Sequence, residues 1–260
     1  MTQRDHFAQV ASIYESLRTT DAAPVTTIRQ LLPDHPVVGV DVGCGTGRYS
    51  RLLGERLPAG SLLVASDVSA AMLAELRSGL GRPSLAPLLS TAEELPLRDG
   101  SLDLVTSFNS VHHFDLGRFL ACASRVLRPG GLLFVYTRTP EQNARTIWGR
   151  FFPGFAEHEQ RLHSERALRG AVRRTSGLVL AAMRRFRYRR TSTHERLRAQ
   201  VEGRHYSTFS LYAPDELVAA LDVFLARLPG REVPWLDEHL MMVARRSRLR
   251  GAGLPASRKG

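Results

Sequence analysis

The residues best suited to bind a ligand lie in and after a glycine-rich turn. The turn spans residues 41–47, with the sequence DVGCGTG, and Asp67 follows it by 20 residues. Glycines such as Gly43 and Gly45 permit the positive-φ backbone that bends a chain sharply and brings it close to a ligand. A carboxylate at the end of the next strand can accept hydrogen bonds from both hydroxyls of a ribose. The combination predicts a nucleoside site, with Asp41 two residues before the first glycine.

The spacing of the glycines narrows the choice of nucleoside. The dinucleotide fingerprint needs glycine at its first, third and sixth positions. Counted from Gly43, the glycines here stand at the first, third and fifth positions, and the sixth residue is Arg48. A dinucleotide and a tight turn without a ligand are therefore the disfavoured alternatives.

Two adjacent histidines, His113 and His112, are the candidate general bases, because histidine titrates near neutral pH. They follow a strand expected over Leu102–Phe108. This places them at the carboxyl edge of a sheet, where open α/β sheets bind their ligands. A packing role for either ring is the alternative interpretation.

Two later segments are candidates for substrate binding. Trp148 and Phe152 are expected to form an aromatic wall, with core packing as the alternative. Arg204, His205 and Tyr206 belong to a polar and aromatic segment that could close over a substrate or pack on the sheet as a loop. The chain's nine histidines are scattered and its two cysteines lack a paired spacing, so no metal site is expected.

The apolar pattern predicts the elements that must position these residues. Strands alternate with helices up to Pro140, which indicates a parallel sheet covered on both faces. The expected strands are residues 37–42, Leu62–Ala65, Leu85–Leu89, Leu102–Phe108, Leu132–Tyr136, Leu178–Tyr188 and Leu240–Ala244. The expected helices are residues 7–17, Val25–Leu32, Tyr49–Leu57, Ala70–Leu80, Leu116–Leu127, Arg161–Arg174, His194–Val201 and Asp215–Leu228. Trp148–Phe155 is expected to be a loop or a cap rather than a strand.

The net charge of +11 is unevenly distributed. Residues 1–140 hold 13 arginines and 13 acids, whereas residues 141–260 hold 23 basic residues and 12 acids. A solvated surface, a pocket for an anionic small molecule and a nucleic-acid surface all fit this excess. The polar N-terminus predicts no signal peptide, no apolar run is long enough to span a membrane, and two distant cysteines fit a reducing compartment. We therefore expect a cytoplasmic protein whose oligomeric state the sequence leaves open.

The order of the motifs resembles the class I S-adenosylmethionine-dependent methyltransferases. Residues 41–47 resemble the first motif of that family, residues 66–72 (SDVSAAM) the second, and residues 92–96 (AEELP) the adenine-site loop. Residues 102–113 resemble its fourth-strand motif, and residues 127–131 (LRPGG) the turn before its fifth strand. The resemblance is to the type 11 branch, which includes ubiquinone and menaquinone biosynthesis enzymes, and it ends near Tyr136.

The resemblance implies a fold and a set of cofactor residues. The fold is α/β, with a Rossmann-like, seven-stranded, mostly parallel sheet, helices on both faces, an N-terminal helical segment and a small helical and aromatic cap. Residues 1–35 would form that segment over the cofactor, 36–140 the cofactor-binding core, 141–245 the cap with the rest of the sheet, and 246–260 a basic disordered tail. The implied cofactor residues are Tyr14, Arg18, Asp41, Gly43, Gly45, Asp67, Val68, Met72, Ala92, Glu93 and Asn109.

The implied activity is methyl transfer from S-adenosyl-L-methionine to a small molecule, with S-adenosyl-L-homocysteine as the product. The reaction is an in-line displacement, and methylation of oxygen or nitrogen is expected rather than of carbon. Two alternatives remain at this point: an RNA methyltransferase that uses the arginine-rich second half, and a cofactor-binding partner subunit without catalytic activity.

Overall fold

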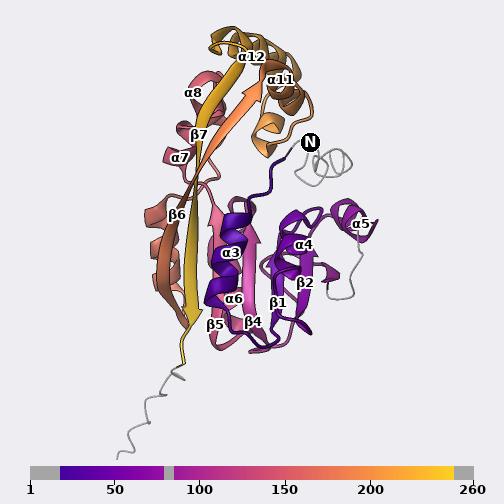
Figure 1. Ribbon diagram of the computed structural model, residues 1–260. Helices are drawn as coiled ribbons and strands as arrows, with labels where there is room; N and C mark the ends of the chain where they lie inside the picture. The colour runs from indigo at the N-terminus through magenta and orange to yellow at the C-terminus, as the bar shows by residue number, and fades with distance from the viewer. Residues whose placement is uncertain (1–17, 79–84, 249–260) are drawn as a thin grey trace, which may run out of the picture.

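The computed structural model describes residues 18–78 and 85–248, in which seven strands form one sheet (Figure 1). The strands are β1 Val38–Val42, β2 Leu62–Asp67, β3 Leu85–Leu89, β4 Leu102–Phe108, β5 Leu127–Thr137, β6 Leu178–Thr193 and β7 Glu232–Arg246. Their order across the sheet is β3-β2-β1-β4-β5-β7-β6. Strands β1 to β5 pair in parallel, and β7 is antiparallel to both of its neighbours. The predicted fold class, a Rossmann-like and mostly parallel seven-stranded sheet, is confirmed.

The central strands are buried on both faces because helices cover each side of the sheet. Every residue of β4 is buried, including the polar residues Asp103, Thr106 and Ser107, as expected for a strand covered on both faces. Helices α6 and α10 pack on one face, and α3, α4 and Leu76 of α5 pack on the other. The bounds of these helices are α3 Ala22–Leu31, α4 Arg48–Gly54, α5 Ala70–Ser78, α6 Leu116–Val126 and α10 Glu165–Arg174.

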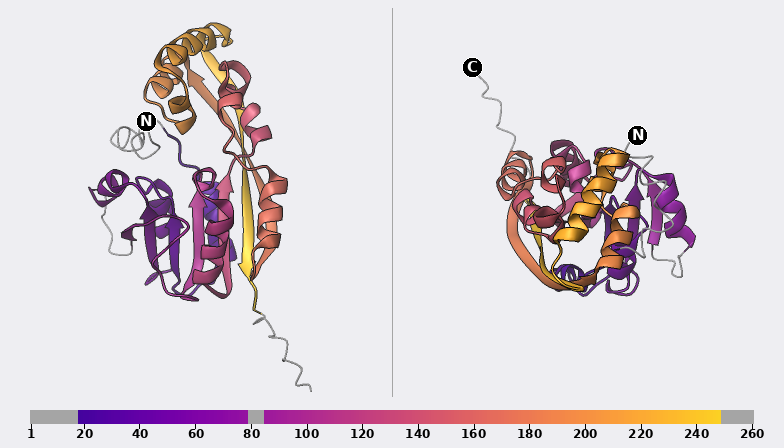
Figure 2. Two further views of the ribbon diagram at one scale, coloured as in Figure 1. Left: turned by 180° about the vertical axis from the view of Figure 1, so that it is seen from behind. Right: turned by 90° about the horizontal axis from the view of Figure 1, so that it is seen from above.

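The last two strands are longer than the sheet that they complete. Strand β7 pairs with β5 only over Leu240–Arg245, but it pairs with β6 from Glu232 to Arg246. The outer halves of β6 and β7 therefore form a two-stranded ribbon that rises above the core (Figure 2). Because a ribbon of two strands has no further strand beside it, its stability depends on the elements packed against it.

Helices around this ribbon form a second layer, which we call the cap. The cap has its own apolar core, in which Trp148, Phe209 and Phe224 are buried. Figure 2 shows these helices above the carboxyl ends of the parallel strands. Its elements are α7 Pro140–Ala144, α8 Ile147–Phe151, α9 Phe155–His158, α11 His194–Glu202, the 3-10 helix η2 Ser207–Leu211, α12 Pro214–Arg227 and the outer halves of β6 and β7.

The structure corrects several of the expected elements. The strands expected to end at Tyr188 and to begin at Leu240 extend to Thr193 and back to Glu232. Their outer halves are polar and only partly buried, so they lack the apolar run that marked the inner halves. Residues 148–155, expected to be a loop or a cap rather than a strand, belong to the cap, and they contain most of the short helix α8 and the first residue of α9. The expected helix over residues 7–17 lies outside the described residues.

Candidate active site

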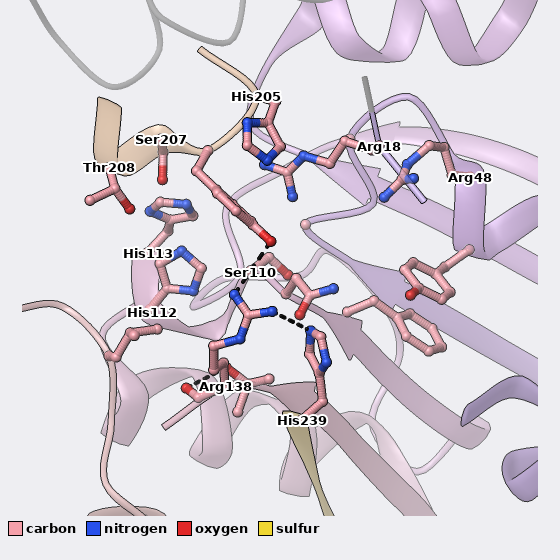
Figure 3. Close-up of a pocket in the computed structure, with 18 of the residues that line it drawn as sticks. Arg18, Arg48, Ser110, His112, His113, Arg138, His205, Ser207, Thr208 and His239 are labelled. Atoms are coloured by element: carbon pink, nitrogen blue, oxygen red, sulfur yellow. Dashed lines mark hydrogen bonds between the residues drawn. The ribbon is translucent and has the colours of Figure 1, made fainter. Parts of the chain in front are cut away.

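A cavity of about 430 Å³ lies between the carboxyl ends of the parallel strands and the cap (Figure 3). Its floor consists of the loops that follow β1, β2, β3, β4 and β5, and its roof consists of the cap. Open α/β sheets bind ligands at this edge. The cavity therefore lies where the sequence places the nucleoside site.

The three glycines of the turn all have positive φ, but they differ in what surrounds them. A Cβ on Gly43 would lie 2.6 Å from Ser110 Cβ, and one on Gly47 would lie 2.0 Å from Leu76 Cδ1. A Cβ on Gly45 would meet nothing within 4 Å. Gly43 and Gly47 thus allow the chain to pack closely, whereas Gly45 leaves open space beside the turn that a ligand can enter.

Asp41 lies beneath the turn and is 1% exposed. Its carboxylate accepts hydrogen bonds from Ser50 Oγ at 2.6 Å and from Thr106 Oγ1 at 2.9 Å. Burial raises the pKa of Asp41 to about 7, although both hydroxyls oppose the shift. This residue joins β1, β4 and α4 at the base of the cavity.

Asp67 ends β2 and turns toward the glycines. The backbone N–H of Gly45 donates to Asp67 Oδ2 at 2.8 Å, and that of Ser69 donates to Oδ1 at 2.9 Å. Burial raises the pKa of Asp67, and these hydrogen bonds oppose the rise. Thr46 Oγ1 is buried nearby and has no hydrogen-bond partner in the described part of the chain. The open space beside Gly45, the hydrogen-bonded carboxylate of Asp67 and the unpartnered hydroxyl of Thr46 together fit a nucleoside that carries a polar group.

The structure brings most of the expected cofactor residues together around this cavity. Its lining includes Arg18, Asp41, Gly43, Gly45, Asp67, Val68, Met72, Ala92, Glu93 and Asn109. Glu93 also accepts a hydrogen bond from the backbone N–H of Asp115 at 2.9 Å. Asn109 has a φ of 53°, which a non-glycine residue rarely adopts, and this conformation follows the end of β4. Tyr14 lies outside the described residues.

His112 and His113 belong to a 3-10 helix, η1 Val111–His113, and both line the cavity. Their ring centroids are 4.0 Å apart. Burial and Arg161 lower the pKa of His112 to about 3, and burial and His112 lower the pKa of His113 even further. Both imidazoles are therefore neutral at neutral pH and are weak bases.

The cap supplies the other side of the cavity. Trp148 lines the cavity and also packs in the cap core, stacked on Phe224 at a centroid distance of 5.0 Å. Phe152 lies in that core, 5.1 Å from the ring of Phe209, and it is not among the lining residues. Of the two roles considered for Phe152, the structure shows core packing.

The polar segment of the cap contributes two of its three expected residues. His205 and Tyr206 line the cavity, whereas Arg204 does not. His205 Nδ1 lies 2.9 Å from the carbonyl oxygen of Gln200, and because a carbonyl only accepts, this nitrogen carries the proton. Burial and Arg18 lower the pKa of His205 well below its usual range.

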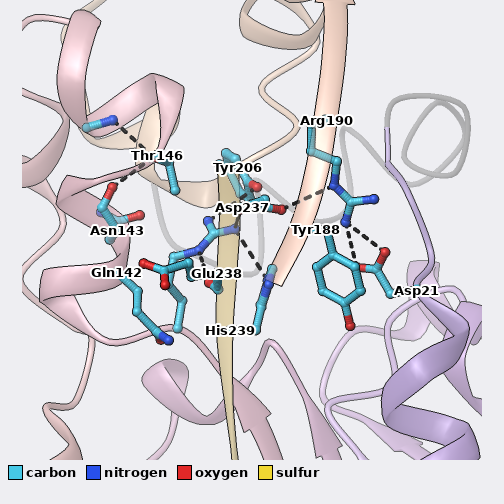
Figure 4. Close-up of polar contacts among 12 residues, drawn as sticks. Asp21, Gln142, Asn143, Thr146, Tyr188, Arg190, Tyr206, Asp237, Glu238 and His239 are labelled. Carbon is cyan, nitrogen blue, oxygen red and sulfur yellow. Dashed lines mark hydrogen bonds and ion pairs between the residues drawn. The ribbon is translucent and has the colours of Figure 1, made fainter. Parts of the chain in front are cut away.

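Sequence reasoning missed a polar network that joins the core to the cap (Figure 4). Arg138 follows β5, and its guanidinium forms an ion pair with Asp237 of β7. Arg190 of β6 donates from Nη2 to both carboxylate oxygens of Asp21 at 2.7 Å, and its Nε lies 3.6 Å from Asp237 Oδ2. All four residues line the cavity. Arg138 could have been identified from the sequence, because it directly follows a parallel strand and such positions lie at the ligand-binding edge of the sheet.

No group of three or more metal-ligating side chains gathers within the described residues. None of the helices in residues 18–78 and 85–248 is both long and apolar enough to cross a membrane.

Comparison with a family model matches residues 40–135 to the methyltransferase domain. An uncharacterised methyltransferase of Mycobacterium tuberculosis is 38% identical over 144 residues, which are 55% of this chain and 56% of that protein. A trans-aconitate 2-methyltransferase of Deinococcus radiodurans is 35% identical over 124 residues, which are 47% of this chain and 46% of that protein. The chain thus spans about half the length of the curated relatives that it matches.

A solved geranyl diphosphate methyltransferase, in complex with S-adenosylmethionine, superimposes with a TM-score of 0.55. The match covers 86% of this chain and 85% of that structure, at 19% identity. At this identity the likeness shows the fold alone.

Proposed function

We propose that this chain, whose residues 40–135 belong to the class I S-adenosylmethionine-dependent methyltransferases, methylates an oxygen or nitrogen atom of a small molecule. The observation that carries the proposal is the open cradle formed by Gly45, Thr46 and Asp67 in the cavity between the strand ends and the cap. The acceptor would occupy the space between this cradle and Trp148 and Tyr206 of the cap.

Each side of the cavity has a distinct role in this proposal. Asp67 binds the ribose hydroxyls, Ala92 and Glu93 lie beside the adenine, and Gly45 and Thr46 face the methionine end. When bound, S-adenosylmethionine supplies an electrophilic methyl group on a sulfonium. The protein must then hold the acceptor atom in line with that methyl at roughly 3 Å and exclude water. The cap is suited to both tasks because its aromatic core fixes the wall that faces the strand ends.

The low basicity of the cavity histidines favours an acceptor that is already deprotonated when it binds. The pKa values of His112 and His239 are both lowered to about 3, so neither ring is well matched to remove a proton from an alcohol at neutral pH. A carboxylate needs no such base, because it is ionised at neutral pH. The trans-aconitate 2-methyltransferase that this chain resembles carries a carboxylic acid in its name. We therefore infer that the acceptor is a carboxylate and the product its methyl ester.

The charges of the second half support a small acceptor rather than RNA. Several of its arginines are paired with acids: Arg145 and Arg187 with Glu238, Arg161 with Glu159, Arg169 and Arg185 with Glu165, and Arg190 with Asp21. Paired arginines attract phosphates less strongly than free ones. Retention on RNA that falls steeply with salt would favour the RNA alternative instead.

The experiment is incubation with methyl-labelled S-adenosylmethionine, separately with a panel of small carboxylic acids and with a metabolite extract. The proposal predicts label in a base-labile methyl ester that forms only with active protein. Label in a base-stable product would contradict the carboxylate assignment. Cofactor binding without transfer to any acceptor would favour a non-catalytic partner subunit.

A further inference from the structure

We propose that Arg138 is a positioning residue that fixes the protons of Tyr206 and His239, so that the Tyr206 hydroxyl is left to donate to the acceptor. The inference rests on the proposed function, because it concerns the acceptor side of the same cavity. Arg138, Tyr206 and His239 all lie beyond the family motifs, which end near Tyr136.

Arg138 contacts both rings through one guanidinium. It is 7% exposed and lies directly after β5. Its Nη1 donates to the Tyr206 hydroxyl at 3.4 Å, and its Nη2 contacts His239 Nε2 at 3.3 Å. Its Nε donates to the carbonyl oxygen of Glu238 at 3.3 Å. Figure 3 shows the Arg138 guanidinium beside the His239 ring among the residues that line the cavity.

The direction of these hydrogen bonds follows from the chemistry of guanidinium. Arginine has five N–H donors and no acceptor. The Tyr206 oxygen and His239 Nε2 must therefore both accept. His239 is neutral at neutral pH, because burial and Arg138 lower its pKa to about 3. Since Nε2 accepts from Arg138, the single proton of the neutral ring is on Nδ1, which is buried and has no hydrogen-bond partner among the described residues. The hydroxyl hydrogen of Tyr206 has no hydrogen-bond acceptor among the described residues.

The surrounding charges explain how the Arg138 guanidinium can stay buried. Asp237 forms an ion pair with it, and despite burial the charges of Arg138 and Arg190 keep the pKa of Asp237 low. Asp21 in turn pairs with Arg190. The network is thus close to neutral, and what it offers the cavity is a directed O–H rather than a free positive charge.

A carboxylate acceptor makes use of such a donor. One carboxylate oxygen attacks the methyl group, and the other can accept the hydrogen bond from Tyr206. The O–CH₃ bond forms as the sulfur–methyl bond breaks, and the electron pair of that bond stays on sulfur. No proton transfer is needed. Tyr206 would orient the acceptor so that the reacting oxygen faces the cofactor.

The first test is nitrogen NMR of the histidine rings, which needs no acceptor. In the wild type, the His239 signal, assigned by its loss in His239→Gln, should show a protonated Nδ1 and an unprotonated Nε2. Arg138→Met should move His239 toward the Nε2–H form, while Arg145→Met, whose residue contacts Glu238 but does not line the cavity, should not. An Nε2–H wild type, or a tautomer unchanged by Arg138→Met, would overturn the role of Arg138.

The second test is steady-state kinetics on the acceptor that the labelling experiment yields. Tyr206→Phe should raise the acceptor KM about tenfold or more, with the Kd for S-adenosylhomocysteine unchanged. Arg138→Met should act in the same way, and the double variant should add little to either single change. An unchanged KM in Tyr206→Phe, or fully additive effects, would overturn the inference. Failure of the proposed function would show instead as absent turnover with the NMR result intact.

Discussion

The carboxylate of Asp67 accepts a hydrogen bond from the backbone N–H of Gly45 at 2.8 Å, which joins the end of β2 to the glycine turn after β1. The residue expected to bind a ribose is therefore held in place by the turn that the ligand would approach. Preorganisation of this kind lowers the cost of ordering the side chain when a ligand binds.

Replacement of this carboxylate should weaken cofactor binding. Asp67→Ala removes the acceptor for two ribose hydroxyls and should cost about 1–3 kcal/mol of binding free energy for S-adenosylhomocysteine. Calorimetric titration measures the change. Asp222→Ala, at an exposed acid on α12, is the matched control and should bind as the wild type does. Equal affinity of the Asp67 variant and the control would remove the ribose assignment.

Substitutions of Gly45 and Gly47 should affect ligand binding and folding stability to different extents. Gly45→Ala places a Cβ in open space at a φ of 57°, so it should cost about 1–2 kcal/mol of stability and also hinder the ligand. Gly47→Ala adds a clash with Leu76 to the same backbone penalty and should cost more stability. Urea unfolding and calorimetry on both variants give the comparison. A Gly45 variant that binds normally would mean that the ligand lies elsewhere.

The ion pair between Asp21 and Arg190 should stabilise the cap on the core. The residues are 169 positions apart in sequence, and their side chains are 9% and 19% exposed. Burial raises the pKa of Asp21 even against the pull of Arg190, so desolvation offsets part of the attraction. Arg190→Gln leaves the buried Asp21 carboxylate unpaired and should lower the free energy of unfolding by about 2 kcal/mol. Asp21→Asn should lower it by less, because it also removes the desolvation cost of that carboxylate. A double-mutant cycle should show strong coupling, and independent effects would contradict the contact.

Acid should destabilise the protein through its buried histidines. The pKa of His239 is lowered to about 3 in the folded state from 6.5, so between these values only the unfolded chain binds the proton. Its stabilising contribution is complete above pH 6.5 and is lost as pH falls, by up to about 1.4 kcal/mol per pH unit. His239→Gln should therefore flatten the fall of unfolding free energy between pH 6 and pH 4, measured by urea titration. An unchanged slope would show that the ring is protonated in the folded protein.

Asp41 should have the opposite pH dependence. Its pKa is raised to about 7 from 3.8, so between these values the folded protein binds a proton that the unfolded chain lacks. Its contribution is complete below pH 3.8 and is lost as pH rises through 7. Asp41→Asn, which keeps an acceptor for one of the two hydroxyls, should raise the stability at pH 7.5 relative to that at pH 5, compared with the wild type. A variant that follows the wild-type pH profile would contradict the raised pKa.

The cofactor side of the cavity could be predicted from the sequence because the residues that form it lie close together along the chain. The β1 strand lies in a nearly continuous run of valines over residues 37–42, the turn after it carries glycines, and Asp67 ends the next strand. The cradle therefore follows from residues close in sequence. The acceptor side depends on contacts between distant residues. Arg138 and Asp237 meet only because β7 lies antiparallel beside β5, a pairing that no local pattern indicates.

The same reason explains why Phe152 and Trp148 could not be told apart from sequence. Both are aromatic residues near the start of the cap and both pack in its core, but only Trp148 also lines the cavity, and this difference depends on the tertiary packing of the cap. The long outer halves of β6 and β7 were missed because a two-stranded ribbon needs no apolar run.

The cofactor site is tested most directly by calorimetric titration of the purified protein with S-adenosylhomocysteine. We expect saturable binding at one site per chain, weakened by Asp67→Ala and unaffected by Asp222→Ala. Folded protein that gives no binding heat at several temperatures, and no shift in Tm with the ligand, would contradict this expectation.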